Sequence, residues 1–439
     1  MITRRQALAS SHFGAGYVAL RTLATGLPAA LLINPRKALA DMPAACDPTT
    51  TSKAQFIIFA TSGAGDAMNA NVPGTYDDPK IAHPTSPEMA PGTLRIQGQS
   101  YTAAMPWTTL PQDVLDRTVF WHMMTNTPVH PKEPDVLKLM GTTGGGEMLP
   151  SLLARHLAPC LGTIQMQPIS IGASSPSEGL TFAGEAQPIM PPLALRATLA
   201  NPAGPLTNLI QLRDQALNQL YDIYKNGATP AQRQYIDSMV TSQSQVRNIR
   251  QDLINALAAI TDNSAASQMT AAVALIQMKV APVITIHIPF SGDNHRDIAL
   301  AAESAQTASG IAAIGALMTQ LKSAGLADQV TLMSLNVFGR TLGPTNTDGR
   351  SHNPNHQVSL TIGKPFRGGV IGGVAPFQSD YGAMPIDSKT GNGSASGDIA
   401  PVDTLASFGQ SMLAAVGIAP AVIASDISKG QIVAPALAG

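Results

Sequence analysis

The chain has 439 residues, a formal net charge of −1 at pH 7 and 13% charged residues, about half of the usual charged share. It has no basic stripe and no acidic tail, so nucleic acid is not expected as a partner. Hydrophobic residues make up 44% and aromatic residues only 4%, so the core must be built mainly from Ala, Val, Ile, Leu and Met. The length suffices for one large domain or two ordinary ones.

The first forty residues have the layout of a secretory signal. Arg4-Arg5 begins it, a weakly apolar stretch follows over 13–33, and Ala38-Leu39-Ala40 supplies a small-x-small cleavage site. The paired arginines and the modest hydrophobicity favour the twin-arginine route. We therefore predict that residues 1–40 are a signal peptide, recognised by the twin-arginine translocase and then removed. The mature protein is expected to be exported, either periplasmic or extracellular.

The apolar stretch of this signal is not expected to remain in a membrane. Arg21 and Pro28 interrupt it, whereas a membrane span needs about 20 clean apolar residues. Later in the chain no apolar run is long enough, so no stable membrane span is predicted for the mature form. A cytoplasmic N-terminal amphipathic helix is the alternative interpretation of residues 1–40.

The two cysteines, Cys46 and Cys160, are too few for a disulfide scaffold and form no Cys-x-x-Cys metal pair. Export would permit a bridge between them. The sequence alone is equally consistent with two unpaired thiols.

Short apolar runs bounded by turn residues predict the buried strands of the mature chain. They cover 55–60, 117–124, 283–288, 330–335 and 358–362, and helices are predicted over 147–158, 299–324 and 403–416. Strands that alternate with helices imply an α/β fold with a largely parallel central sheet covered by helices on both faces. Residues 71–112, rich in Pro, Gly, Ser and Thr, are predicted to be an irregular excursion.

The clearest helical periodicity lies in 206–280. Asn226-Gly227 is expected to end one helix, and Thr229-Pro230 to cap and begin the next. A short break between two long periodic segments predicts an antiparallel helical hairpin over 206–262. The mature chain, 41–439, is thus predicted to be a single domain with a helical insertion at about 206–280.

Polar residues follow the ends of the predicted strands. They are Asp66 after the first strand, Thr125, Thr127 and His130 after the second, Asp293 and His295 after the third, and Asn336 and Arg340 after the fourth, with His352 and His356 before the fifth. Ligands of open α/β sheets bind beyond the carboxyl ends of the strands, so these residues are expected to meet there.

Asp and His are ligands suited to a divalent metal such as zinc, and a carboxylate-rich site also suits calcium or manganese. We expect the metal ligands to be Asp66, Asp293, His295 and His352. The alternatives are that Asp66 caps a turn and that the Asp and His residues are ordinary surface groups. His287 lies inside an apolar strand and is expected to be a core histidine whose hydrogen bonds are satisfied.

Three stretches resemble a bacterial family known as domain of unknown function 1501. The first stretch runs from Asn336 to Thr341, continues with Asp348 to His352, and is followed by Gly363 and Gly368-Gly369. The second runs from Gly63 to Asn69, and the third from Gly292 to His295. That family belongs to the alkaline phosphatase/sulfatase-like superfamily, and its members commonly carry twin-arginine signals. The resemblance implies the corresponding α/β fold and the hydrolysis of a phosphate or sulfate ester.

The chain departs from this family at three positions of the site. Val337 stands where the family tends to have Glu, and Ser351 where it tends to have Asp. Val129 replaces the serine of a Ser-His pair, which removes a hydroxyl nucleophile that Thr125 or Thr127 would have to replace. The loss of two carboxylates weakens a two-metal site, so one divalent metal is expected.

The resemblance thus implies an exported, metal-dependent hydrolase with a degenerate site and low activity. Its substrate would be an anionic ester, which Arg340 would hold. The alternative is a non-catalytic exported protein that uses the same fold as a binding or assembly scaffold. Val337 and Ser351 favour the scaffold, whereas Asp293 and His295 favour the hydrolase.

Overall fold

The computed structural model describes most of the chain from Cys46 onward. The described residues are 46–66, 68–163, 165–172, 178–199, 257–287, 292–343 and 348–439, with a number of positions between 219 and 255. The predicted signal peptide, residues 1–40, lies outside the described residues, as does most of the predicted helical hairpin.

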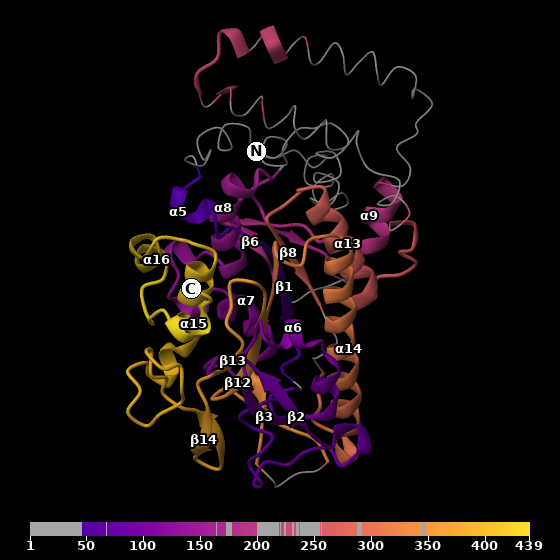
Figure 1. The fold of residues 1–439 in the computed structure, drawn as a ribbon, viewed down its shortest axis with the longest axis vertical. Helices are drawn as coiled ribbons and strands as arrows, with labels where there is room; N and C mark the ends of the chain where they lie inside the picture. Colours follow the sequence, from indigo (N-terminus) through magenta and orange to yellow (C-terminus); the bar gives the residue numbers. More distant parts are fainter. Residues whose placement is uncertain are drawn as a thin grey trace, which may run out of the picture.

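A seven-stranded sheet forms the centre of the molecule (Figure 1), in the order β13-β4-β12-β9-β1-β8-β5. The strands are β1 (Phe56–Ser62), β4 (Thr118–Met123), β5 (Ile169–Ser170), β8 (Val283–Ile286), β9 (Val330–Asn336), β12 (Gln357–Ile362) and β13 (Gly369–Ile371). Within this sheet β12 runs antiparallel to both neighbours, β4 and β9, while the other pairs are parallel. The predicted α/β fold with a mostly parallel sheet is confirmed.

Helices pack against both faces of the sheet. One face carries α13 (Ala265–Gln277) and α14 (Ala301–Ser323), and the other carries α7 (Glu133–Leu137), α8 (Leu149–Leu161), α15 (Thr404–Ala415) and α16 (Pro420–Asp426). Smaller helices are α5 (Pro48–Thr51), α6 (Gln112–Leu115) and α9 (Pro192–Leu199). Small antiparallel pairs join β6 (Thr181–Phe182) to β7 (Glu185–Ala186), β10 (Gly339–Arg340) to β11 (His352–Asn353), and β14 (Val374–Phe377) to β15 (Asp380–Ala383).

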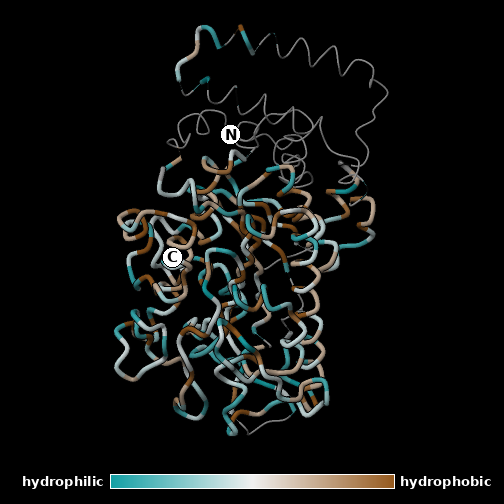
Figure 2. Tube along the Cα trace, viewed as in Figure 1, coloured by the Kyte–Doolittle hydropathy of each residue, from teal (hydrophilic) through white to brown (hydrophobic). Residues whose placement is uncertain are grey.

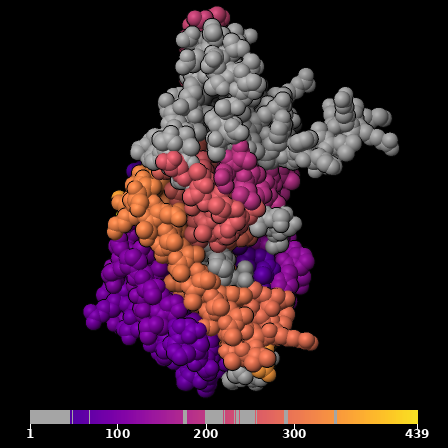
Figure 3. All heavy atoms as spheres, turned by 90° about the vertical axis from the view of Figure 1, so that its right-hand side faces the viewer, coloured from indigo at the N-terminus to yellow at the C-terminus, as the bar shows by residue number. Residues whose placement is uncertain are grey.

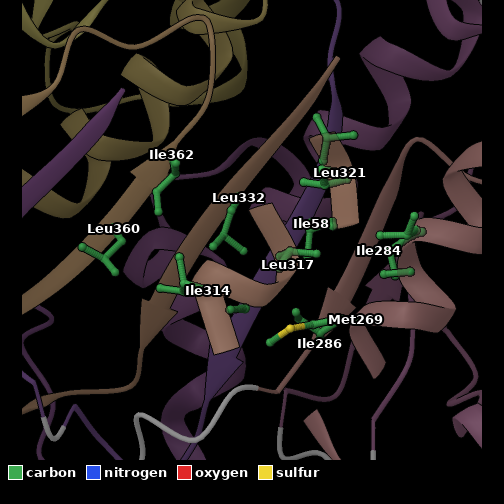
Figure 4. Packing of buried hydrophobic residues seen from close by; sticks show 14 of the residues in the cluster. Ile58, Met269, Ile284, Ile286, Ile314, Leu317, Leu321, Leu332, Leu360 and Ile362 are labelled. Atoms are coloured by element: carbon green, nitrogen blue, oxygen red, sulfur yellow. The ribbon is translucent and has the colours of Figure 1, made fainter. Parts of the chain in front are cut away.

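The alternation of side chains along β1 divides the apolar interior into two cores. Phe56, Ile58 and Ala60 face the α13–α14 side, whereas Ile57 and Phe59 face the α8–α15 side. Figure 4 shows how the isoleucine and leucine side chains of α14 lie against those of the strands, and Figure 2 shows hydrophobic segments running through the interior. Full burial of each such side chain stabilises the fold by about 1.5–3 kcal/mol, so both helical layers are held on the sheet by aliphatic packing.

The excursion over 71–112 contains regular structure that was not predicted. An antiparallel hairpin joins β2 (Pro91–Ile96) to β3 (Gln99–Ala104), and Gln97 and Gly98 form its tip, both with positive φ. Alternating exposed and buried residues along β2 explain the pairing, because a two-residue turn with positive φ matches the twist of a hairpin. The prediction of an irregular excursion is therefore wrong for 91–104. Figure 3 shows α14, in orange, lying beside this indigo and purple segment.

The predicted break inside the helical block is present. Residues 221–223 and 225–226 are helical, 227–229 are not, and the helix resumes at 230. Thr229 Oγ1 accepts a hydrogen bond from the Gln232 amide, and Gln232 Oε1 accepts one from the Thr229 amide. This reciprocal pair is a capping box, and it confirms the helix start predicted at Thr229-Pro230. The remainder of the hairpin lies outside the described residues.

A disulfide joins Cys46 to Cys160. It ties the segment before α5 to the last turn of α8, across 114 residues of sequence. A disulfide is consistent with an exported protein, because oxidising compartments permit its formation. Among the described helices, none combines the length and the hydrophobicity that a membrane span requires.

Candidate metal centre

The antiparallel direction of β12 brings the predicted site residues to one edge of the sheet. Strands β4, β8 and β9 end at this edge, and β12 begins there, since its Gln357 pairs with Met123 at the end of β4. A parallel β12 would have placed the residues that precede it at the opposite edge. His352 lies on β11, which pairs with β10 directly after β9, so it reaches the same edge.

Four side chains form a compact group at this edge: His130, Asp293, His295 and His352. Each offers one ligand atom, and these atoms all lie within 4.8 Å of one another. The Asp293 Oδ1 atom lies 3.1 Å from His295 Nε2, 3.8 Å from His130 Nε2 and 3.8 Å from His352 Nε2. Three of the four residues, Asp293, His295 and His352, were predicted as ligands from the sequence.

Two of the histidines have their ring orientation fixed by main-chain carbonyls. His130 Nδ1 lies 2.7 Å from the Gly63 oxygen, and His352 Nδ1 lies 2.6 Å from the Pro128 oxygen. A carbonyl oxygen only accepts hydrogen bonds, so both Nδ1 atoms donate. In the neutral rings Nε2 then keeps its lone pair directed at the group, which is the tautomer that a metal ligand needs.

The spacing of the ligand atoms suits one ion. The Nε2 atoms of His295 and His352 are 2.9 Å apart. Nitrogen ligands of one tetrahedral zinc ion lie about 3.3 Å apart, because each Zn–N bond is about 2.0–2.1 Å long. Burial lowers the pKa of His352, and the charge of Arg340 lowers it further. The hydrogen bond to the Pro128 oxygen raises this pKa, but the net shift is downward. A neutral His352 is favoured, as metal binding requires.

Arg340 lies beneath the group and is completely buried. Its guanidinium donates to the carbonyl oxygens of Ala64 and Gly292, both at 2.5 Å, and its Nη1 lies 3.3 Å from Asp293 Oδ1. Burial raises the pKa of Asp293, but the charges of His295 and Arg340 outweigh that effect and hold this pKa below its usual value. Arg340 therefore holds the segment that carries Asp293, and the burial of its side chain does not suit the predicted role of binding a substrate anion.

Asp66 stands outside the group of four. Its side chain is buried, and its two oxygens accept hydrogen bonds from the Met68 and Val358 amides at 2.9 and 2.8 Å. Burial raises the pKa of Asp66 to about 7, although these two hydrogen bonds act to lower it. The carboxyl group thus joins the end of β1 to the start of β12, a structural role close to the turn-capping alternative.

The two threonines predicted as nucleophiles are buried. Thr127 Oγ1 accepts a hydrogen bond from the Val129 amide, and Thr125 Oγ1 has no hydrogen-bond partner among the described residues. Neither hydroxyl forms a described hydrogen bond with the four residues of the group. A buried hydroxyl is poorly placed to attack a substrate that enters from solvent.

His287 is partly buried directly after β8, and its partner is a carboxylate, which agrees with the satisfied histidine that was expected. Its Nε2 lies 2.7 Å from Glu178 Oε2, and Glu178 is buried. Burial would lower the pKa of His287, but the hydrogen bond and charge of Glu178 outweigh it and raise this pKa. No sequence pattern indicates this partner, because Glu178 is 109 positions away and follows no predicted strand.

His130 is the member of the group that sequence reasoning missed. It was noted among the polar residues after the second strand, yet it was not expected to bind metal. Its position seven residues after Met123, beyond the same sheet edge as Asp293, was the available signal.

Comparison with known proteins gives a family match over part of the chain. Three of the four residues of the group, together with Arg340, lie within 198–389, whereas His130 and Asp66 lie before that range. A search of curated proteins finds no match. Over residues 198–389, less than half of its length, the chain matches the family described as "Protein of unknown function (DUF1501)".

Proposed function

We propose that His130, Asp293, His295 and His352 bind one divalent metal ion. The observation that carries this proposal is the convergence of four ligand atoms within 4.8 Å, with two of the rings oriented by carbonyl oxygens. Three imidazoles and one carboxylate favour zinc, with manganese as the next candidate. Calcium is disfavoured, because it prefers a shell of oxygen ligands.

We further propose that the exported protein hydrolyses anionic phosphate or sulfate esters slowly. The bound ion would supply Lewis-acid polarisation of an ester oxygen. Asp293 and His295 are about half exposed, with 56% and 45% of their side chains accessible, so an ester has access to the group from solvent. Since Thr125 and Thr127 are buried, solvent water is the favoured nucleophile.

One observation favours the alternative, a non-catalytic binding or assembly scaffold. The guanidinium of Arg340 is buried and already bonded to two carbonyl oxygens and Asp293. Without a free cation from Arg340, an ester anion would rely on the metal ion alone. Val337 adds no ligand, because its side chain lies in the apolar core.

The export route remains a proposal that rests on Arg4-Arg5 and Ala38-Leu39-Ala40. N-terminal sequencing of the protein from a host with a working twin-arginine system should begin at or near Asp41. Full-length protein retained in the cytoplasm of that host would overturn the proposal.

The metal proposal is tested by titrating the metal-free protein with zinc and measuring bound metal by mass spectrometry. We expect one equivalent for the wild type and none for Asp293→Ala, with an unchanged circular dichroism spectrum. Asp113→Ala is the matched control, since Asp113 is an exposed aspartate paired with Lys322 on another part of the surface. Equal zinc binding by Asp293→Ala would refute the site.

The hydrolase proposal needs a separate assay with nitrophenyl phosphate and nitrophenyl sulfate. We expect weak turnover that requires zinc and disappears in Asp293→Ala. Zinc binding without any turnover would favour the scaffold, whereas turnover that survives Asp293→Ala would show that the chemistry lies elsewhere.

A further inference from the structure

A phenylalanine with no ligand atom contacts two of the four proposed metal ligands. The Phe338 ring stacks on His352, with centroids 4.1 Å apart and an interplanar angle of 25°. It meets His130 edge to face, at 4.9 Å and 67°. Both geometries are favourable for aromatic pairs, so one ring contacts two imidazoles from distant parts of the sequence.

The Phe338 backbone is fixed from both sides. The Asp66 amide donates to the Phe338 carbonyl at 2.9 Å, and the Val337 amide donates to the Ser62 carbonyl at 3.0 Å. The ring is completely buried, and the Arg340 guanidinium lies 5.5 Å from its centroid. The ring therefore has a defined position before any ligand binds.

Gly65 provides the space that this position needs. Its φ is +96°, and a Cβ atom there would lie 2.6 Å from Phe338 Cε2. A side chain at position 65 would push the ring toward the histidines or strain the turn after β1.

We propose that Phe338 is a positioning residue of the metal site. Its ring restricts rotation of the His130 and His352 imidazoles, so that their Nε2 atoms point at Asp293 before the metal arrives. The hydrogen bonds to Gly63 and Pro128 set which nitrogen carries the proton, and the ring sets the plane of each imidazole. This inference rests on the proposed metal site, yet it concerns ring orientation, which can be measured without metal.

Replacing Phe338 by leucine keeps an apolar side chain and removes the flat surface. We expect Phe338→Leu to bind zinc about 10–100-fold more weakly, the usual cost of losing an outer partner of a metal ligand. The cobalt(II)-loaded variant should also show a shifted and weaker visible absorption spectrum than the wild type. Phe408→Leu is the matched control, because Phe408 is equally buried, packs edge to face on Trp121 and contacts none of the four ligands.

Nitrogen-15 NMR of the metal-free protein separates this inference from the metal proposal. The wild type and Phe408→Leu should show His130 and His352 as single Nδ1–H tautomers. Phe338→Leu should show tautomer mixtures, because imidazoles that rotate freely lose the hydrogen bonds to the Gly63 and Pro128 oxygens. That pattern supports the positioning role even if the wild type binds no metal, in which case the metal proposal alone fails. Unchanged tautomers in Phe338→Leu would overturn the inference, and so would a zinc affinity equal to that of Phe408→Leu when the wild type binds zinc.

Discussion

At the scale of single residues, hydrogen bonds to main-chain amides separate Asp66 from Asp293, which lies in the group of four. Asp293, His295 and His352 follow or precede predicted strands and do converge. Asp66 follows a strand equally well, yet its oxygens are taken by the Met68 and Val358 amides. That difference depends on hydrogen bonds between segments 292 positions apart, which no local pattern encodes.

Gly349 is predicted to hold together the two loops of the proposed metal site that carry His295 and His352. Its φ is +137°, and a Cβ atom there would lie 2.4 Å from the His295 carbonyl oxygen. Gly349→Ala should therefore separate His295 from His352 and lower zinc affinity at least 10-fold, measured by competition with a chelator. Gly145→Ala is the control, since Gly145 also has a positive φ but no atoms near its Cβ position. Equal zinc affinity in the two variants would contradict the prediction.

A buried pair of histidines gives a pH dependence of stability. His122 Nε2 lies 2.8 Å from the Pro73 oxygen, to which it donates, and His122 Nδ1 lies 3.0 Å from His356 Nε2. Burial lowers both pKa values, that of His122 to about 4. A histidine whose pKa is lowered by folding does not destabilise the protein above pH 6.5, the approximate pKa of histidine in the unfolded chain. As the pH falls from 6.5 toward 4, the free energy of unfolding decreases, because the unfolded chain takes up protons that the folded protein does not.

The free energy of unfolding in urea should therefore decrease from pH 6.5 to 4.5 more steeply in the wild type than in His122→Asn. Each of the two histidines contributes at most about 1.4 kcal/mol per pH unit to the slope of the free energy of unfolding in this range. His122→Asn should be less stable at pH 7, because it leaves His356 without its partner. Parallel pH profiles for the two proteins would contradict this assignment.

At the scale of elements, long periodic segments were predicted and short strands were not. The predicted strands correspond to β1, β4, β8, β9 and β12, and the predicted helices to α8, α14 and α15. The two-residue β5 and the three-residue β13 are too short to give a periodicity. The direction of β12 also escaped prediction, because it depends on the path of the chain between β9 and β12.

Three neighbouring strands are joined by one carboxylate. Glu178 accepts hydrogen bonds from Thr61 on β1, Ser170 on β5 and Thr285 on β8, and it pairs with His287. Glu178→Gln should lower the free energy of unfolding by about 3 kcal/mol, because it breaks a buried ion pair and removes an acceptor. Urea unfolding checks this, with Glu185→Gln as an exposed control on β7. The prediction is refuted if Glu178→Gln lowers the free energy of unfolding no more than Glu185→Gln does, within the measurement error.

At the scale of the whole molecule, the layered arrangement follows from strands that alternate with helices, whereas the disulfide does not follow from the sequence. Cys46 and Cys160 lie next to each other only because α8 packs beside α5. The bond closes a loop of 114 residues, which in the chain-entropy account contributes about 4–5 kcal/mol to the free energy of unfolding.

Replacing both cysteines, by Cys46→Ser with Cys160→Ser, should lower the melting temperature relative to the oxidised wild type. A reduced wild type should melt like the double variant, and an unchanged melting temperature would show that the bond does not form in solution.

Binding of one metal ion by three histidines and one aspartate can be tested by X-ray absorption at the zinc edge of the zinc-loaded protein. The first shell should lie at about 2.0–2.1 Å and contain three imidazoles and one or two oxygens. His130→Ala should remove at least one imidazole from this shell. A first shell made only of oxygens, or one that His130→Ala leaves unchanged, would show that these four residues do not bind the ion.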